Sequence, residues 1–236
     1  GGWTSGSLIA NPNSSWILGN PNGKTVLDSA FRGSNCWMTG GLTGNANSGE
    51  KSYIQSPLFD MTTLLLPTIS FWTKMNLEDS LSGINVWYSI DSSRTWRQLD
   101  SVSGYNPYNV ANIQSAPGHI TPPATSVPGF ALNGDATWGC GTSPWRYVSI
   151  LVPQVSGSPV ASFRIYFSQR TTPRPGEGIL IDDFLILSPD SVILPDTIRL
   201  CPGMTTTLLG PFFPNIPPHA TSSILWSTGA TTQAIS

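Results

Sequence analysis

The chain has 236 residues, and only 24 of them are charged (11 Lys or Arg plus 13 Asp or Glu), which leaves a formal net charge of −2. The charged fraction of 10% is far below the roughly 25% of an ordinary soluble domain. A small net charge excludes nucleic-acid binding through phosphates, and low charge with 9 Trp and 9 Phe excludes a disordered chain. No apolar run approaches the ~20 residues of a membrane span. With 23 Gly and 21 Pro, we expect a folded, turn-rich β protein with enough apolar residues for a core.

The two ends of the sequence carry no start or targeting signal. The chain opens with Gly-Gly-Trp, without Met or a signal peptide, and closes at Ile235-Ser236 in what has the pattern of a beginning strand. We expect it to be a processed or excised piece of a longer protein.

Runs with strand character are frequent, whereas helical periodicity is nearly absent. The runs are residues 52–59, 68–75, 83–90, 95–99, 145–152, 160–168 and 179–187. Within residues 163–168, Phe, Ile and Phe alternate with Arg, Tyr and Ser, and residues 86–90 alternate in the same way. A period of two places one row in a core and the other outside. Such runs, joined by Gly, Pro, Ser and Asn, predict an all-β fold built as an antiparallel sandwich.

Residues 103–144 break this pattern, because they are rich in Pro, Gly and Asn and show no sustained alternation. A loop of this length inside a compact domain is either functional or disordered. It carries Tyr105, Tyr108 and Trp138, which could form an aromatic platform for sugar rings or a protein partner. The alternative is that these rings fold back over a sheet as cover for the core.

The sequence pattern changes again after Leu187, where Ser188-Pro189-Asp190 predicts a turn. We place a domain over residues 1–188, a linker at 189–196 and a second β module at 197–236. The second module has too few residues for an independent sandwich, so it is truncated.

Three cysteines are present, Cys36, Cys140 and Cys201, and none has the C-x-x-C spacing of a zinc site. An odd number suggests one bridge and one cysteine whose partner lies outside this sequence. We favour a Cys36–Cys140 disulfide, with Cys201 pairing beyond Ser236 or staying a buried thiol. The alternative is three unpaired cysteines.

Several motifs together resemble a known family. They are Trp16-x-x-Gly19-x-Pro21, Ala30-x-x-Gly33-x-x-Cys36-Trp37, Glu50-x-Ser52-Tyr53-x-x-Ser56-Pro57, Pro67-x-Ile69-Ser70-Phe71-Trp72 and Glu177-Gly178-x-x-Ile181-Asp182-Asp183-Phe184. In this order they resemble the MAM-like and cleaved-adhesin-like domains secreted by Bacteroidetes, over Trp3 to about Leu187 apart from residues 103–144. The resemblance implies a jelly-roll sandwich of the kind found in large surface adhesins and as an accessory domain of secreted proteases.

The tail resembles a different module. Leu200-Cys201-Pro202-Gly203 and Trp226-Ser227-Thr228-Gly229 are similar to Ig-like repeats in cargo proteins of the type IX secretion system. This resemblance implies export to the cell surface or the medium.

Asp182 and Asp183 are the most informative acids, because they interrupt the apolar run 179–187. Apolar residues at both parities predict a strand covered on both faces, where unpaired carboxylates are costly. Ca²⁺ accepts carboxylates and backbone carbonyls in flexible geometry, and the resemblance implies a structural Ca²⁺ here, with Glu50 as a second ligand and Asp28 as a weaker third. The alternative is that these acids cap turns or pair with Arg at the strand end.

Residues 89–96, Ser-Ile-Asp-Ser-Ser-Arg-Thr-Trp, are similar to the Asp-box hairpin S-x-D-x-G-x-x-W, with Ser93 in the glycine position. Asp91 can accept backbone N–H bonds while Trp96 packs underneath. We assign this hairpin a structural role.

The sequence contains few of the residue patterns that a catalytic site requires. The two histidines, His119 and His219, both lie in Pro-rich segments, and neither G-x-S-x-G nor H-E-x-x-H occurs. Glu78 and Asp79 are adjacent, so on a strand they would point in opposite directions. We expect no enzyme activity within this chain.

We therefore expect a non-catalytic adhesion or interaction module of a larger secreted or cell-surface protein, binding a glycan or a protein through loops. The alternatives are an accessory domain of a secreted protease or glycoside hydrolase, and a structural spacer without a ligand. Several of the scarce acids fall at motif positions: Glu50, Asp60, Asp91, Asp182 and Asp183. The surface should therefore consist mainly of Ser, Thr, Asn and Gly, and the loss of any one of these acids should matter.

Overall fold

The computed structural model describes residues 2–78, 81–99, 108, 110–114, 126–132, 142–172, 174–187, 208–209 and 234–235. These residues form an all-β structure, with two short 3-10 turns, η1 (Pro21–Gly23) and η3 (Pro153–Val155). None of the helices in this part of the chain has the length and apolar character needed to cross a membrane.

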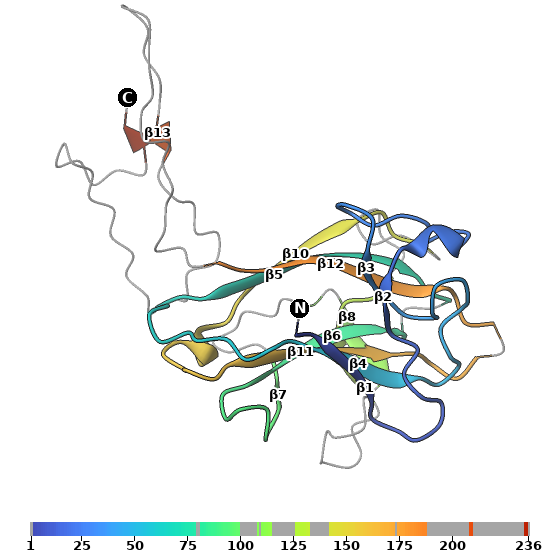
Figure 1. Ribbon diagram of the computed structural model, residues 1–236, viewed down its shortest axis with the longest axis horizontal. Helices are drawn as coiled ribbons and strands as arrows, with labels where there is room; N and C mark the ends of the chain where they lie inside the picture. The colour runs from blue at the N-terminus through green and yellow to red at the C-terminus, as the bar shows by residue number, and fades with distance from the viewer. Residues whose placement is uncertain are drawn as a thin grey trace, which may run out of the picture.

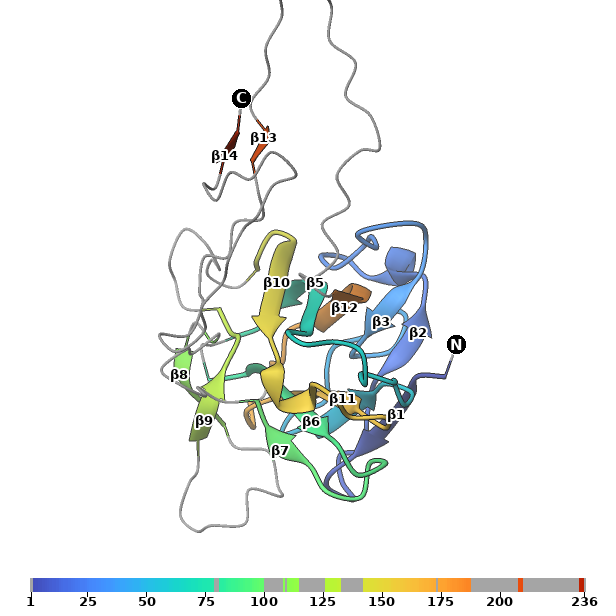
Figure 2. The ribbon, with the colours of Figure 1, turned by 90° about the vertical axis from the view of Figure 1, so that its left-hand side faces the viewer.

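Two five-stranded antiparallel sheets lie one above the other (Figures 1 and 2). The first sheet has the order β1 (Thr4–Ser7), β4 (Lys51–Gln55), β11 (Ser162–Ser168), β6 (Gly83–Ser89) and β7 (Arg97–Gln98). The second sheet has the order β10 (Arg146–Leu151), β5 (Thr68–Asn76), β12 (Gly178–Leu187), β3 (Cys36–Met38) and β2 (Ile17–Gly19). The predicted antiparallel sandwich is confirmed.

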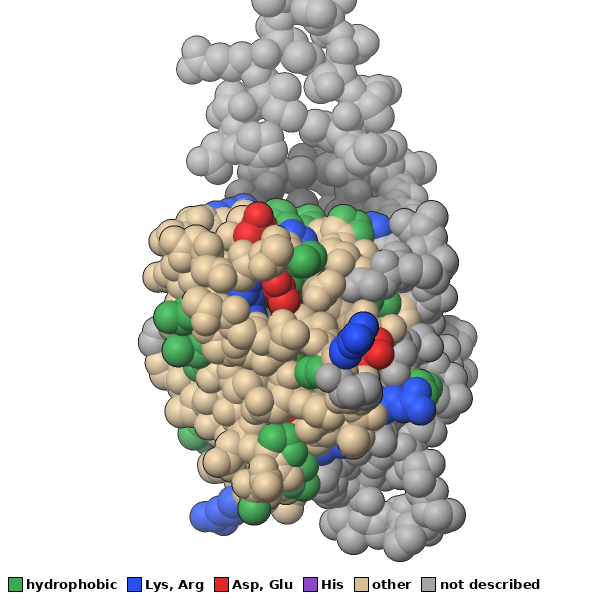
Figure 3. Space-filling view, turned by 90° about the vertical axis from the view of Figure 1, so that its right-hand side faces the viewer, with side chains coloured by type: hydrophobic (Ala, Val, Ile, Leu, Met, Phe, Trp, Pro, Cys, Tyr) green, Lys and Arg blue, Asp and Glu red, His purple; other side chains and the backbone are tan. Residues whose placement is uncertain are grey.

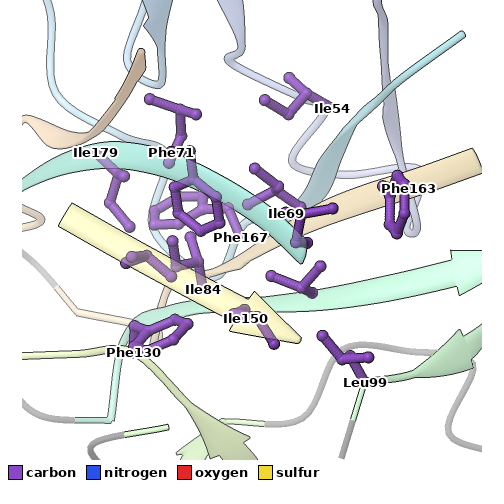
Figure 4. Close-up of a cluster of buried hydrophobic side chains, with 14 of the residues drawn as sticks. Ile54, Ile69, Phe71, Ile84, Leu99, Phe130, Ile150, Phe163, Phe167 and Ile179 are labelled. Atoms are coloured by element: carbon purple, nitrogen blue, oxygen red, sulfur yellow. The ribbon is translucent and has the colours of Figure 1, made fainter. Parts of the chain in front are cut away.

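The core fills the space between the sheets (Figure 4). Phe163, Ile165 and Phe167 of β11 point inward and are fully buried, as the period of two predicts, and Phe71 and Ile69 of β5 face them from the second sheet. Burying each such side chain contributes about 1.5–3 kcal/mol, so the inward rows of the two sheets supply the main stabilisation of the fold.

All seven predicted runs contain strands, although their bounds differ by several residues. Ile90, predicted to continue the inward row of β6, lies beyond the strand and is 45% exposed. Strands β1, β2 and β3 were not predicted, because three or four residues are too few to show alternation.

Residues 103–144 contain strands that the sequence pattern does not predict. Strands β8 (Val110–Gln114) and β9 (Ser126–Gly129) form an antiparallel pair, with a register shift between Val110 and Ile113. That irregular register explains why no clean alternation is visible. In the tail, β13 (Leu208–Leu209) pairs with β14 (Ala234–Ile235); most of the predicted linker and Ig-like module lies outside the described residues.

Candidate binding face

Residues 24–33, hereafter the 24–33 loop, lie against the outer face of the second sheet. Leu27 of this loop packs with Cys36 and Met38 of β3 and with Leu180 of β12 in a small cluster separate from the main core. Figure 1 shows η1 and the chain after it on the outer side of this sheet. Ile179 and Ile181 face the main core while Leu180 faces the loop, so this half of β12 is covered on both faces, as predicted.

A single carboxylate anchors the start of the 24–33 loop. Glu177 accepts hydrogen bonds from the backbone N–H groups of Thr25 (2.8 Å), Val26 (3.0 Å) and Leu27 (2.7 Å). Burial alone would raise the pKa of Glu177, but these N–H groups and the charge of Lys24 outweigh burial and lower it. The carboxylate is therefore held ionised, and its negative charge orders three consecutive peptide groups.

Two of the four acids predicted as calcium ligands, Asp182 and Asp183, hold the other end of the loop. Asp182 accepts a hydrogen bond from the backbone N–H of Arg32 (3.0 Å), and the Arg32 guanidinium pairs with Asp183 at 3.3 Å. Both acids lie where the register of β12 shifts between Asp182 and Leu185, and Asp183 has a φ of +49°. Asp is one of the few residues that tolerate this left-handed conformation, so the bulge aims both carboxylates at the loop.

A third tether comes from β5. The Lys74 ammonium donates to the carbonyl of Val26 at 3.2 Å and lies 3.9 Å from the Asp28 carboxylate. The Asp28 side chain is largely exposed, so this ion pair contributes little by itself. Its position shows that Asp28 contacts a cation of the protein.

The held loop lays Phe31 against an aromatic group on the sheet. The Phe31 ring stacks on the Trp72 indole of β5, with centroids 3.9 Å apart and planes 13° from parallel. The Trp72 ring also contacts that of Tyr147, its cross-strand partner on β10, with ring centroids 5.3 Å apart. Phe31 contacts Trp145 edge-on, with ring centroids 5.7 Å apart. We call Phe31, Trp72, Trp145 and Tyr147 the aromatic face. Its outermost ring, Tyr147, is 50% exposed.

The aromatic face has a polar side and an apolar side. Arg32, Asp182 and Asp183 lie beside Phe31 and supply hydrogen-bonding groups. Leu185 (51% exposed) and Leu187 (43% exposed) follow the two acids on β12 and form the apolar side of the aromatic face. An exposed aromatic group between polar and apolar borders is the arrangement of a recognition surface for amphipathic ligands.

Glu50 is fully buried and takes no part in this face. Its carboxylate oxygens accept hydrogen bonds from Ser15 N (2.8 Å), Ser15 Oγ (2.6 Å), Ser52 Oγ (2.6 Å) and Asn47 N (3.2 Å). Its carboxylate is therefore satisfied by donors of the protein, and it ties the segments around Ser15 and Asn47 to the start of β4.

The four predicted calcium ligands do not fit a single metal site in this arrangement. Among the described residues no three His, Cys, Asp or Glu side chains form a group that could hold a metal ion. Glu50, Asp182 and Asp183 each have protein partners that match the alternative of turn capping and Arg pairing. Calcium binding by Asp182 and Asp183 with backbone carbonyls stays a prediction.

The predicted loop platform requires correction at Tyr108. This residue is 8% exposed, its ring packs edge-on against Phe130, and its hydroxyl bonds both the N–H and the carbonyl of Val86. Tyr108 therefore covers the core, because a phenol can bury its ring only when its hydroxyl finds partners. Tyr105 and Trp138 lie outside the described residues.

The predicted Cys36–Cys140 disulfide is also corrected, because Cys36 is a free, buried thiol. Burial raises the pKa of Cys36 to about 12, and the nearby Asp182 carboxylate adds to this rise. Cys36 packs as a small apolar side chain against Leu27 and Leu180. Cys140 and Cys201 lie outside the described residues.

The Asp-box-like hairpin has the predicted structural geometry. Asp91 accepts hydrogen bonds from Arg94 N (3.1 Å), Thr95 N (2.9 Å) and Thr95 Oγ1 (2.6 Å), which lower its pKa. Ser92 and Ser93 have φ values of 60° and 65°, and Trp96 packs against a cluster on the first sheet. Elsewhere, Glu78 accepts a hydrogen bond from Thr172; Asp79, His119 and His219 lie outside the described residues.

Sequence reasoning missed the aromatic face, although one signal was present. Trp72 occupies the outward parity of β5 and Tyr147 the outward parity of β10. What the pattern could not reveal is that β5 and β10 are neighbours, or that Phe31 from a loop docks on their outer side.

No family profile and no curated protein matches the sequence. Among solved structures, the chain is similar to the K1 cleaved adhesin domain of Lys-gingipain from Porphyromonas gingivalis W83, at 16% identity and a TM-score of 0.45, covering 79% of this chain and 90% of that chain. It is also similar to TmCBM61, solved in complex with beta-1,4-galactotriose, at 13% identity and a TM-score of 0.41, covering 79% and 88%. At these values the likeness carries no argument about a ligand.

The scarcity of charge is visible on the surface. Figure 3 shows the end of the sandwich near η1, where only scattered side chains are acidic or basic and most of the area belongs to other groups. Long-range electrostatic attraction is therefore weak at this end of the sandwich, and recognition there must rely on short-range contact.

Proposed function

We propose that this chain is a non-catalytic carbohydrate-binding module of a secreted or cell-surface protein, and that it holds sugar rings against the aromatic face. The observation that carries the proposal is Tyr147, a half-exposed ring in direct contact with the Trp72–Phe31 stack. Aromatic rings offer a large flat area at low cost in conformational entropy. A sugar presents a matching flat row of C–H groups on one side of its ring.

The rigidity of the face supports binding. Glu177 fixes the start of the 24–33 loop, and Asp182 and Asp183 fix Arg32, next to Phe31. A surface that is already ordered loses less entropy when it binds its ligand.

The disposition of the nearby acids favours binding over hydrolysis. Glycosidases place two carboxyl groups on either side of the scissile bond, roughly 5–10 Å apart. Asp182 and Asp183 are neighbours on one strand, and both are engaged with Arg32. They can orient hydroxyl groups of a sugar but do not enclose a bond between them.

The test is a glycan array followed by calorimetric titration of each hit. Tyr147→Ala and Trp72→Ala should weaken binding at least tenfold, whereas Tyr147→Phe, which keeps the ring, should bind within about threefold of the original protein. Leu65→Ala, at a remote residue that is 72% exposed, is the matched control and should bind normally. Hits unaffected by Tyr147→Ala and Trp72→Ala would overturn the proposal.

A second candidate, adhesion to a protein, is favoured by the exposed Leu185 and Leu187, which extend the aromatic face along β12. Leu185→Asp separates the two functions. It should abolish capture of a protein from cell-surface extracts and leave binding of a free oligosaccharide intact. In either case the chain would act within a larger protein, as an adhesin or as an accessory domain of a protease or glycosidase.

A further inference from the structure

We propose that the outer face of the first sheet carries a second binding site, in which Arg164 takes the carboxylate of an acidic sugar. Arg164 lies on β11, the central strand of this sheet, and points away from the core. The site is separate from the aromatic face, which lies on the other sheet, so neither proposal rests on the other.

Two aromatic rings hold the Arg164 side chain. Its guanidinium carbon lies 4.0 Å from the ring centroid of Tyr53 on β4 and 4.0 Å from that of Trp96 in the β6–β7 hairpin. Cation–π contacts of this kind occupy the flat faces of the guanidinium and leave its edge for hydrogen bonding.

The sheet in turn fixes these rings. Tyr53 lies across Gly6, its cross-strand partner on β1, so closely that a Cβ on Gly6 would be 2.5 Å from the Tyr53 hydroxyl. Trp96 packs against Trp87 and Tyr166 in the cluster on this face, and Asp91 closes the hairpin that carries it. Arg164 is therefore oriented before any ligand arrives.

Hydrogen bonds fix the rotation of the guanidinium. Nε donates to Gln55 Oε1 at 2.8 Å and Nη1 donates to the Tyr166 hydroxyl at 3.0 Å. The Tyr166 hydroxyl, on a side chain that is 5% exposed, accepts this bond and holds the guanidinium from the buried side. One Nη1 proton and both Nη2 protons have no partner in these bonds, and charged oxygens of an anion can accept them.

The charge of Arg164 is not neutralised by the part of the protein that the structure describes. The ion pairs there are Arg32–Asp183 and Lys74–Asp28, and neither includes Arg164. A partly exposed cation held rigid without a counter-charge, in a chain with few charges of either sign, favours an external anion.

The neighbours of Arg164 indicate a sugar as the carrier of that anion. The partly exposed Gln55 and Ser93 supply amide and hydroxyl groups beside the guanidinium, and Gln55 Nε2 lies 3.4 Å from Ser93 Oγ. Uncharged donors and acceptors next to aromatic rings suit the hydroxyl groups and ring of a hexuronate. A strongly acidic peptide would require further cations, and Arg164 is the cation at the centre of this face.

The test titrates the whole chain with a galacturonate trisaccharide and, in parallel, with its carboxyl-reduced, neutral counterpart. Binding is followed by tryptophan fluorescence and by the NMR signal of the Arg164 Nε–H group. We expect the acidic trisaccharide to shift both signals and the neutral one to bind at least tenfold more weakly. Equal binding of the two sugars would overturn the proposal without any variant.

Variants then locate the site. Arg164→Lys keeps the charge but loses the planar fork, and should weaken binding of the galacturonate trisaccharide at least tenfold. Arg94→Lys is the matched control and should bind normally, because Arg94 is an exposed residue of the β6–β7 hairpin, which also carries Trp96. Trp72→Ala should also bind normally, because it alters only the other face. The proposal is wrong if Arg164→Lys binds normally, if Trp72→Ala abolishes this binding, or if a hexaglutamate peptide binds tenfold better than the sugar.

Discussion

The ring of Phe31 stacks on the indole of Trp72, with a centroid separation of 3.9 Å and an interplanar angle of 13°. Phe31 belongs to a loop and Trp72 to a strand, so the contact exists only because the loop is held on the sheet. The aromatic face thus depends on the acids that anchor the 24–33 loop, and this dependence can be measured.

The stack should appear as a coupling free energy between its two rings. We expect Phe31→Ala and Trp72→Ala to be non-additive, with a coupling of about 0.5–1.5 kcal/mol in a double-mutant cycle measured by urea unfolding. As a control, Phe31→Ala should combine additively with Leu65→Ala, a distant exposed residue. Additive effects of Phe31→Ala and Trp72→Ala would show that the stack contributes nothing to stability.

Glu177→Gln should loosen the loop. The amide would turn an N–H group toward backbone donors that now meet a carboxylate, and we expect a loss of about 1–3 kcal/mol, or about 3–10 °C in Tm. Glu78→Gln, at an exposed side chain, is the control. Unchanged hydrogen exchange at Thr25 and Leu27 in Glu177→Gln would contradict this role.

The same carboxylate predicts a response to acid. Because the folded-state pKa of Glu177 is lowered, its stabilisation is fully present above the ordinary pKa of 4.5 and is lost as the pH falls through the lowered folded value. The stability difference between the original protein and Glu177→Gln should therefore shrink as the pH drops below about 4.5. A constant difference from neutral to acid pH would argue against an ionised Glu177.

The buried Lys51 should make the stability of the protein depend on pH in the alkaline range. Burial lowers its pKa from 10.5 to about 8, and its ammonium contacts Ser168. Between these values the unfolded chain binds more protons at Lys51, so the free energy of unfolding should rise from about pH 8 to about pH 9. Above about pH 9 this rise is opposed, because the unfolded chain then loses the Cys36 proton that the folded chain keeps. In Lys51→Met the free energy of unfolding, measured by urea unfolding at each pH, should rise less over this range. A smaller rise should persist, because the pKa of the buried Lys24 is also lowered. An undiminished rise in Lys51→Met would refute the assignment.

Calcium can be tested directly. The sequence predicts a structural calcium held by Asp182 and Asp183 with backbone carbonyls, so metal analysis should find one calcium per chain and mild chelation should lower Tm. No bound calcium and an unchanged Tm would contradict this prediction and leave the backbone N–H and guanidinium of Arg32 as the partners of these acids.

The outcome for the acids shows how far a pattern can lead. The sequence indicated that Asp182 and Asp183 enter a strand covered on both faces and must be compensated. The structure confirms this cover for residues 179–181 but not for the half of β12 that follows the two acids, where Leu185 and Leu187 are exposed. The sequence offered calcium, turn capping or an Arg as the compensating group, but it could not indicate which Arg, because Arg32 reaches Asp183 only after the 24–33 loop has folded back. Glu177 was noted only as part of a motif, since a carboxylate that binds three successive N–H groups leaves no periodic trace in the sequence.

The sequence by itself determined the all-β class, most of the strands and which side chains of β11 face the core, because a period of two is a local property of the chain. The tertiary structure decided what the outward side chains do. Cross-strand pairing placed Tyr147 beside Trp72 and Arg164 beside Gln55, and loop docking added Phe31. These contacts join segments far apart in the sequence, and their geometry is set by sheet order and by buried charge, which no local pattern encodes.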